Sequence, residues 1–216
     1  MRKKVLTLVL AQLLLCGFAI SGTMALLTDR TDPVVNTFTY GDINIDLDET
    51  DTKLDSDDDP GTNKYQMIPG QTIAKDPKIT VYDGSKASWL FVRLDKSDNF
   101  DDFLEYEMAE GWTQLKDSQG NDIAGVFYRQ VEEVTGENSV YGILKEDKVS
   151  VKDSVTKEML NALDPAGGVS TYPTLTVTAY AIQRSGFEPE ISEGASVPTD
   201  EQIAAAALLA WVQIGA

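Results

Sequence analysis

Three aspartates at alternate positions are the residues of this chain best suited to a chemical role. They are Asp55, Asp57 and Asp59. This spacing opens the calcium loop of EF-hand proteins, where carboxylate oxygens bind a hard cation. The pattern then departs from an EF-hand, because Pro60 stands at the glycine position and Gln66 stands at the position of the bidentate glutamate. Two interpretations stay open for the acidic loop 46–61: a looser calcium site, or a solvated loop without metal.

Histidine is absent from the whole chain. This excludes Ser-His-Asp and Cys-His catalysis and every zinc site built on imidazole. Carboxylate-only chemistry, as in glycoside hydrolysis, stays open. However, a chain with 35 Asp and Glu residues always offers a pair of carboxylates, so the pair carries no specific signal. We therefore predict no catalytic residues, no required cofactor and no enzymatic activity.

The first 25 residues have the pattern of a cleaved export signal. Arg2, Lys3 and Lys4 form the positive start, and an uncharged apolar run covers residues 5–20. Small side chains then precede a cleavage point between Ala25 and Leu26. The apolar run is marginal for a bilayer core, which needs roughly 20 apolar residues. We expect a secreted protein that meets a signal peptidase during export and keeps no permanent membrane anchor.

Charge and cysteine content narrow the environment of the mature chain. The net charge is −17, and removing the signal makes it more negative still, which excludes nucleic acid as a partner. Cys16 is the only cysteine and lies within the signal, after Leu15 rather than a small residue, which argues against a lipid anchor. A mature chain without disulfides favours a bacterial extracellular or cell-surface protein. About 190 residues can bury one core, so we expect one domain over residues 41–216.

Alternating apolar residues predict a mostly antiparallel β-sandwich. Residues 34–40 and 43–47 alternate on different faces, which implies a bulge or bend at Gly41, so they form either two short strands or one strand bent at a sheet corner. The clearest strand covers 174–182, with alternate apolar residues inward and threonines outward. Further strands are predicted around Ile79 to Val81, Trp89 to Leu94 and Val126 to Tyr128.

Helical spacing predicts three short helices beside the strands. The first covers 99–109 and the second covers 154–163. The third begins at about Thr199 with a capping-box pattern, Thr199-x-x-Gln202, and extends to about residue 213. Its apolar stripe comprises Ile203, Ala207, Ala210, Trp211 and Ile214, which is typical of a helix that packs on its own core. A helix that binds a partner or a membrane surface stays open as the alternative.

Several of these segments, in this order, resemble the TasA/camelysin family. Gly22-Thr23-Met24-Ala25 resembles the junction cut by the SipW-type signal peptidase. Asn36-x-Phe38-x-x-Gly41-x-Ile43-x-Ile45-x-Leu47 is similar to the family's first strand, and Pro69-Gly70-Gln71-x-Ile73-x-Lys75-Asp76-Pro77 to a later loop. The following matches are Trp89-Leu90-Phe91-Val92-Arg93, Gly111-Trp112-Thr113, Val126-Phe127-Tyr128, Thr178-Ala179-Tyr180-Ala181-Ile182-Gln183 and Phe187.

The resemblance implies a jelly-roll sandwich that forms extracellular fibres of the bacterial biofilm matrix. In such fibres the processed N-terminal segment, here residues 26–40, is donated as a strand to a neighbouring subunit. The partner would be a second copy, head to tail, or a related matrix protein. The expected donor residues are Leu26, Leu27, Val34, Val35 and Phe38, with the polar stretch 28–33 interrupting them.

Two other functions stay open from the sequence. One is a monomeric secreted or cell-surface binding module that uses the acidic face and calcium. The other is a peptidase, because camelysin-like proteins have been classed as metallopeptidases. The chain contains no His-Glu-x-x-His motif and no histidine, which disfavours the peptidase.

Overall fold

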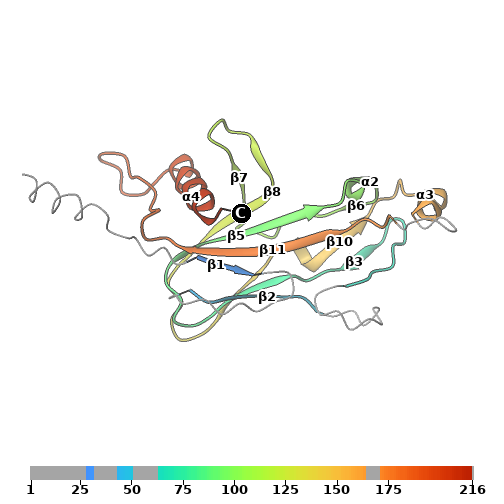
Figure 1. Cartoon of the computed structure of the whole chain (residues 1–216), viewed down its shortest axis with the longest axis horizontal. Coiled ribbons are helices and arrows are strands. Elements are labelled where there is room, and N and C mark those ends of the chain that lie inside the picture. Colours follow the sequence, from blue (N-terminus) through green and yellow to red (C-terminus); the bar gives the residue numbers. More distant parts are fainter. Residues whose placement is uncertain (1–27, 32–42, 51–62, 164–170, 216) are drawn as a thin grey trace, which may run out of the picture.

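The computed structural model describes residues 28–31, 43–50, 63–163 and 171–215. Their fold is mainly β, as the sequence predicts. The strands form three antiparallel sheets, and a long helix follows the last strand (Figure 1). The arrangement is compatible with a jelly roll, which stays a prediction.

The largest sheet contains five strands in the order β1-β11-β5-β8-β7. β11 is the last strand in the chain, yet it lies inside the sheet between β1 and β5. The sheet therefore joins the two ends of the described chain. Its strands are β1 (Thr28–Thr31), β5 (Ser88–Lys96), β7 (Thr113–Lys116), β8 (Asp122–Val131) and β11 (Leu175–Gln183).

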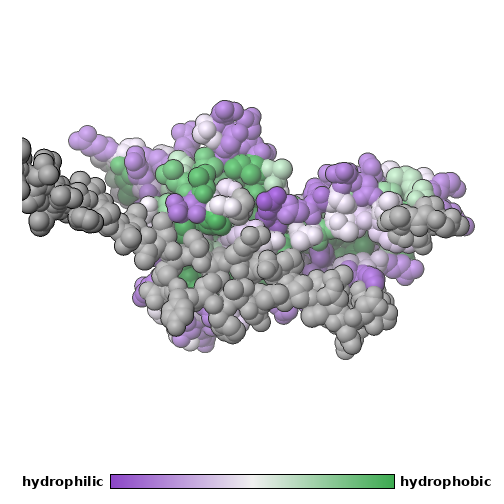
Figure 2. Space-filling model, in the orientation of Figure 1, coloured by the Kyte–Doolittle hydropathy of each residue, from purple (hydrophilic) through white to green (hydrophobic). Residues whose placement is uncertain are grey.

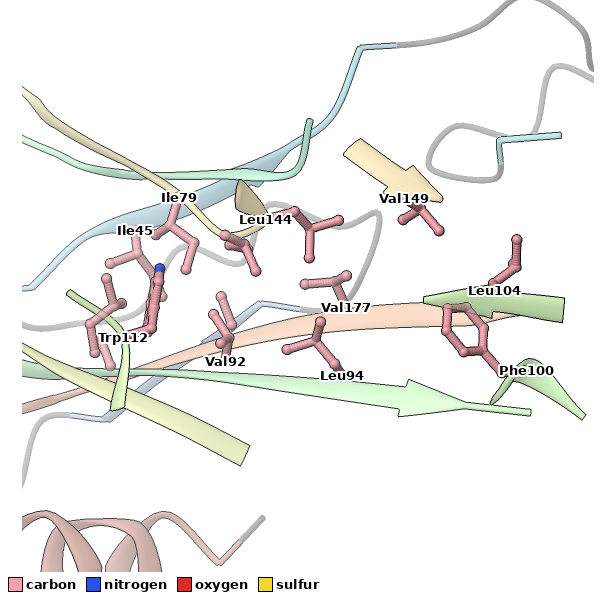
Figure 3. Packing of buried hydrophobic residues seen from close by; sticks show 14 of the residues in the cluster. Ile45, Ile79, Val92, Leu94, Phe100, Leu104, Trp112, Leu144, Val149 and Val177 are labelled. Carbon is pink, nitrogen blue, oxygen red and sulfur yellow. The ribbon is translucent and has the colours of Figure 1, made fainter. Parts of the chain in front are cut away.

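Two three-stranded sheets form the layer opposite this sheet, in the orders β2-β4-β9 and β3-β10-β6. A short 3-10 turn, η1 (Lys145–Asp147), precedes β10. The strands of this layer are β2 (Ile45–Asp48), β3 (Thr72–Ala74), β4 (Lys78–Val81), β6 (Leu104–Glu105), β9 (Ser139–Gly142) and β10 (Lys148–Val151). Figure 3 shows apolar side chains of both layers meeting between the ribbons.

β5 and β11 are buried on both faces, because alternate residues enter two different cores. Leu90 and Val92 of β5 pack into the inner core between the sheets. Trp89 and Phe91 point to the opposite face and pack into an outer core. Both faces of the start of β5 are therefore covered.

The helix α4 (Asp200–Ile214) covers that outer face. Its Trp211 ring packs 5.3 Å from Phe91 and 5.3 Å from Tyr180, measured between ring centroids. The predicted capping box is present at Thr199 and Gln202, and satisfies amide groups at the start of the helix. The predicted role of α4 as a helix docked on its own core is therefore confirmed.

The opposite side of α4 is apolar and open to solvent. Leu209 and Val212 are 64% and 68% exposed, and Figure 2 shows hydrophobic surface gathered over this helix.

The predicted helix over 99–109 is wrong. Only one turn is helical, α2 (Phe100–Phe103), and the chain then extends into β6, which pairs with β10. Strand pairing satisfies the backbone here without the entropic cost of nucleating a longer helix. Phe100, Phe103 and Leu104, which are apolar residues at helical spacing, are nevertheless buried.

Two other predictions need a smaller correction. The helix over 154–163 is shorter, as α3 (Lys157–Ala162), and Thr156 caps it by accepting the amide of Met159. On β11 the threonines do not all face outward to solvent, because Thr178 is only 6% exposed. The outer face of the sheet is covered along much of β11, so alternation there does not separate core from solvent.

Gly125 allows β8 to leave β5. Its φ is +69°, and a Cβ atom at this position would lie 2.2 Å from the carbonyl oxygen of Leu94. Pairing between β8 and β5 extends only over Val126–Val131, whereas the start of β8 pairs with β7. The β7–β8 hairpin therefore bends toward α4 (Figure 1) and contributes Leu115 to the outer core.

Trp211→Ala tests how far the outer core stabilises the fold. Removing a buried indole should lower the free energy of unfolding by about 3 kcal/mol. The measurement is urea denaturation followed by circular dichroism. Val212→Ala, on the exposed side of the same helix, is the control, and should change the free energy by less than about 0.5 kcal/mol. Equal effects of the two substitutions would contradict the docking of α4.

Candidate functional site

The candidate site is the sheet edge where β1 pairs with β11. The register places Thr28 opposite Ile182 and Thr31 opposite Ala179. β1 also approaches β2 of the opposite layer. The first described strand of the chain therefore closes the side of the sandwich along its last strand (Figure 1).

β1 covers the most deeply buried part of β11. From Ala179 to Ile182 the side chains are at most 2% exposed. On its other side β11 pairs with β5 along its whole length. Unpaired backbone groups beside such a buried segment would be costly and would present a template for another strand. The edge thus requires a strand, from this chain or from another.

The sequence of β1 explains why this strand was missed. Thr28-Asp29-Arg30-Thr31 contains no apolar residue, so the apolar pattern of the sequence indicates only a polar interruption over 28–33. That interpretation is wrong for 28–31, where the structure forms the strand. Main-chain hydrogen bonds in a ladder do not depend on side-chain type, so a polar segment can pair when a partner edge is available.

The other predicted site residues lie outside the described residues. They are the cleavage pair Ala25 and Leu26, the donor residues Leu26, Leu27, Val34, Val35 and Phe38, and the aspartates Asp55, Asp57 and Asp59. Within the described residues, no three Asp, Glu, His or Cys side chains gather closely enough to hold a metal ion. In the same part of the chain, no helix is long and apolar enough to cross a membrane.

The structure does describe the two ends of the acidic loop, which are tied to each other and to Lys75. The Lys75 ammonium lies 2.9 Å from both carboxylate oxygens of Glu49, near the start of the loop. The Tyr65 hydroxyl, after the loop, donates to the same carboxylate. Asn63 donates its side-chain amide to the carbonyl of Thr50 at 3.4 Å. Burial and the neighbouring Glu49 raise the pKa of Tyr65, so its hydroxyl stays protonated as a donor.

A second set of contacts holds Thr50 to Asp76. The amide and hydroxyl of Thr50 donate to the Asp76 carboxylate at 3.0 and 2.9 Å, and Lys78 lies 3.2 Å away. Burial alone raises the pKa of Asp76, but the hydrogen bonds from Thr50 and Lys78 outweigh it, so the pKa lies below its ordinary value. We define these residues and the Glu49, Asn63, Tyr65 and Lys75 set as the loop clamp.

The loop clamp gives a role to the Pro69–Pro77 segment. The segment contains the edge strand β3, which pairs with β10, and then presents Lys75 and Asp76 to the loop ends. Both residues belong to the segment that resembles the family, but the sequence does not indicate this role, because the partners of Lys75 and Asp76 lie 26 positions away.

Comparison with family models, with curated proteins and with solved structures gives no match. The resemblance to the TasA/camelysin family therefore stays a prediction from the sequence.

Asp76→Asn tests the loop clamp. Because the folded pKa of Asp76 is depressed, its contribution is complete above the unfolded pKa of about 4 and is lost as the pH falls through the folded value. We expect a loss of about 1 kcal/mol at pH 7, since the group is partly exposed, and a smaller difference from wild type below pH 4. Urea denaturation at pH 7 and pH 3 measures both.

Asp122→Asn is the control, because Asp122 pairs with Lys116 on an exposed hairpin. It should change stability less than Asp76→Asn does. A loss for Asp76→Asn that is equal at both pH values would contradict a role for the ionised carboxylate.

Proposed function

We propose that this protein is a secreted, non-enzymatic structural protein that forms or joins extracellular fibres of a bacterial matrix by exchanging its processed N-terminal strand. The observation that carries the proposal is the position of β1. It is an edge strand of four residues, it completes a deeply buried sheet, and only Leu26 and Leu27 separate it from the predicted cleavage point.

Strand exchange requires no new contacts. The ladder that β1 makes with β11 in its own chain can form equally with β11 of another copy, and residues 32–42 link β1 to the sandwich in either case. A head-to-tail contact of this kind does not close on itself, so repetition gives a filament. The exchanged strand binds by β-augmentation.

Processing would control when exchange begins. Before cleavage the N-terminal segment is joined to the apolar export signal, and after cleavage it starts at Leu26. The family resemblance supports the same order of events, since it places a SipW-type junction at Gly22–Ala25. The absence of histidine from the sequence supports a structural role over a peptidase.

The length of the N-terminal segment provides the first test. A chain starting at Leu26 should form filaments, and a chain starting near Val34, which lacks β1, should not. Electron microscopy and size-exclusion chromatography distinguish the two, with and without Ca²⁺ because of Asp55, Asp57 and Asp59. Monomers under every condition from the longer chain would contradict self-assembly and favour the monomeric binding module.

A pair of cysteines provides a sharper test, because the mature chain contains no other thiol. Asp29 and Ala181 are opposite each other in the β1–β11 register. In the double variant Asp29→Cys/Ala181→Cys, oxidation should link neighbouring subunits of a filament into a covalent ladder on a non-reducing gel. Each single variant is a control, and should give dimers at most.

Oxidation before assembly should instead lock β1 onto its own chain and prevent filaments. Reduction should restore them. Filaments that contain only intrachain disulfides would overturn strand exchange.

A further inference from the structure

Arg129 is a partly buried cation at the side of the sandwich. It lies on β8 opposite Leu90 of β5 in the register, and so faces the layer of β9. Its guanidinium carbon lies 4.2 Å from the ring centroid of Tyr141, on β9, and 5.3 Å from that of Trp112. Two aromatic rings therefore hold the guanidinium by cation–π contact.

The surroundings of Arg129 are fixed from several directions. The Trp112 indole donates to the carbonyl of Gly142 at 2.8 Å, which holds the ring in place. Gly111 has a φ of +88°, and a Cβ atom there would lie 2.9 Å from Nη2 of Arg129. A side chain at position 111 would thus collide with the guanidinium, and glycine leaves it room.

Within the described part of the chain, Arg129 has no acidic partner, unlike Arg184 and Arg93. Arg184 makes two hydrogen bonds to Glu132, at 2.6 and 2.7 Å, and Arg93 pairs with Asp95 at 2.9 Å. Glu133, which follows Glu132 in the sequence, pairs with Lys86. Among the described residues, no carboxylate lies within ion-pair distance of Arg129.

The missing partner is unusual in so acidic a chain, which has 35 Asp and Glu residues against 18 Lys and Arg. The Nε atom of Arg129 is fully buried and has no hydrogen-bond partner. Neither terminal nitrogen of Arg129 combines full burial with the lack of a hydrogen bond. Burial also lowers the pKa of Arg129. A cation that is partly removed from water without a counter-charge is costly, and such groups commonly mark a binding site.

We propose that Arg129, held by Trp112 and Tyr141, binds a carboxylate, and that in the assembled protein an acidic side chain of a second copy supplies it. The terminal nitrogens of an arginine present two parallel N–H donors, which match the two oxygens of a carboxylate. Because the rings already fix the guanidinium plane, little further ordering is needed on binding.

Charge complementarity favours a second copy as the source. The full chain has a net charge of −17, and a copy without the export signal is more negative still, so a second copy offers many carboxylates to the single cation at this site. Among the described strands, β9 has no partner on the edge away from β4, so a neighbouring chain can approach the sandwich beside Tyr141. This contact between two copies would lie at the side of the sandwich, apart from the exchanged strand β1. The identification of a second copy as the source of the carboxylate rests on the proposed assembly, whereas the binding of a carboxylate by Arg129 does not.

The first experiment measures carboxylate binding without filaments. It uses the mature chain of the double variant Asp29→Cys/Ala181→Cys, oxidised before assembly so that β1 is locked onto its own chain; this is the locked chain. The probe is glutarate, and chloride at equal ionic strength is the control. NMR should show a saturable, glutarate-dependent shift of the Trp112 indole N–H, assigned with Trp112→Phe. The shift should fall at least tenfold in Arg129→Gln and partly in Arg129→Lys. It should persist in Arg93→Gln, which removes an arginine already paired.

Two results would overturn the carboxylate site. One is the absence of a glutarate-dependent shift in the locked wild type. The other is an equal shift in Arg129→Gln or with chloride alone. Neither depends on whether filaments form, so the failure of strand exchange and the failure of this site are distinguishable. Urea denaturation of Arg129→Lys and Arg129→Gln verifies that each variant is folded.

The second experiment identifies the source of the carboxylate. In the locked chain, raising the protein concentration should shift the same indole signal, and added glutarate should compete with this self-association. In the unlocked chain, Arg129→Gln should raise the critical concentration for filaments about tenfold relative to Arg93→Gln. A glutarate shift with no effect of protein concentration and no effect on filaments would overturn the second copy as the occupant.

Discussion

The pairing of β11 with β5 is the contact on which the rest of the structure depends. Nine consecutive residue pairs join the two strands, and residues on both faces of the ladder are buried. The inner face carries the core shared with the three-stranded sheets, and the outer face carries the core beneath α4. Because both cores include side chains of the same two strands, disrupting this ladder would disturb the two cores together.

The β1–β11 edge follows from the same constraint. β11 is buried on both faces but is covered on only one edge by β5, so its other edge still requires backbone partners. A short polar strand is sufficient, since the buried side chains come from β11 itself. Such a strand contributes little apolar surface of its own, which makes its attachment easier to exchange than that of β5.

The elements that could be predicted from the sequence are those with a long and regular pattern. β5, β11 and α4 each show the expected periodicity, and tertiary packing agrees with it. The helix over 99–109 failed because its apolar spacing reported burial of Phe100 and Phe103 correctly but not the backbone conformation, which pairing with β10 decides. The prediction missed β1 for the opposite reason. This strand pairs through its backbone, and its sequence shows no alternation of apolar residues. The Arg129 site could not be found from spacing, since Trp112, Arg129 and Tyr141 meet only through the packing of β8 and β9.

The place of β11 in the chain has a consequence for export. The five-stranded sheet cannot close until residues 175–183 are available, and the outer core must wait for α4 after them. A chain that crosses a membrane from its N-terminus would therefore stay open until nearly all of it had passed. Contacts between strands distant in sequence also fold slowly. If the chain is exported as proposed, this topology would delay folding until nearly all of the polypeptide had crossed the membrane.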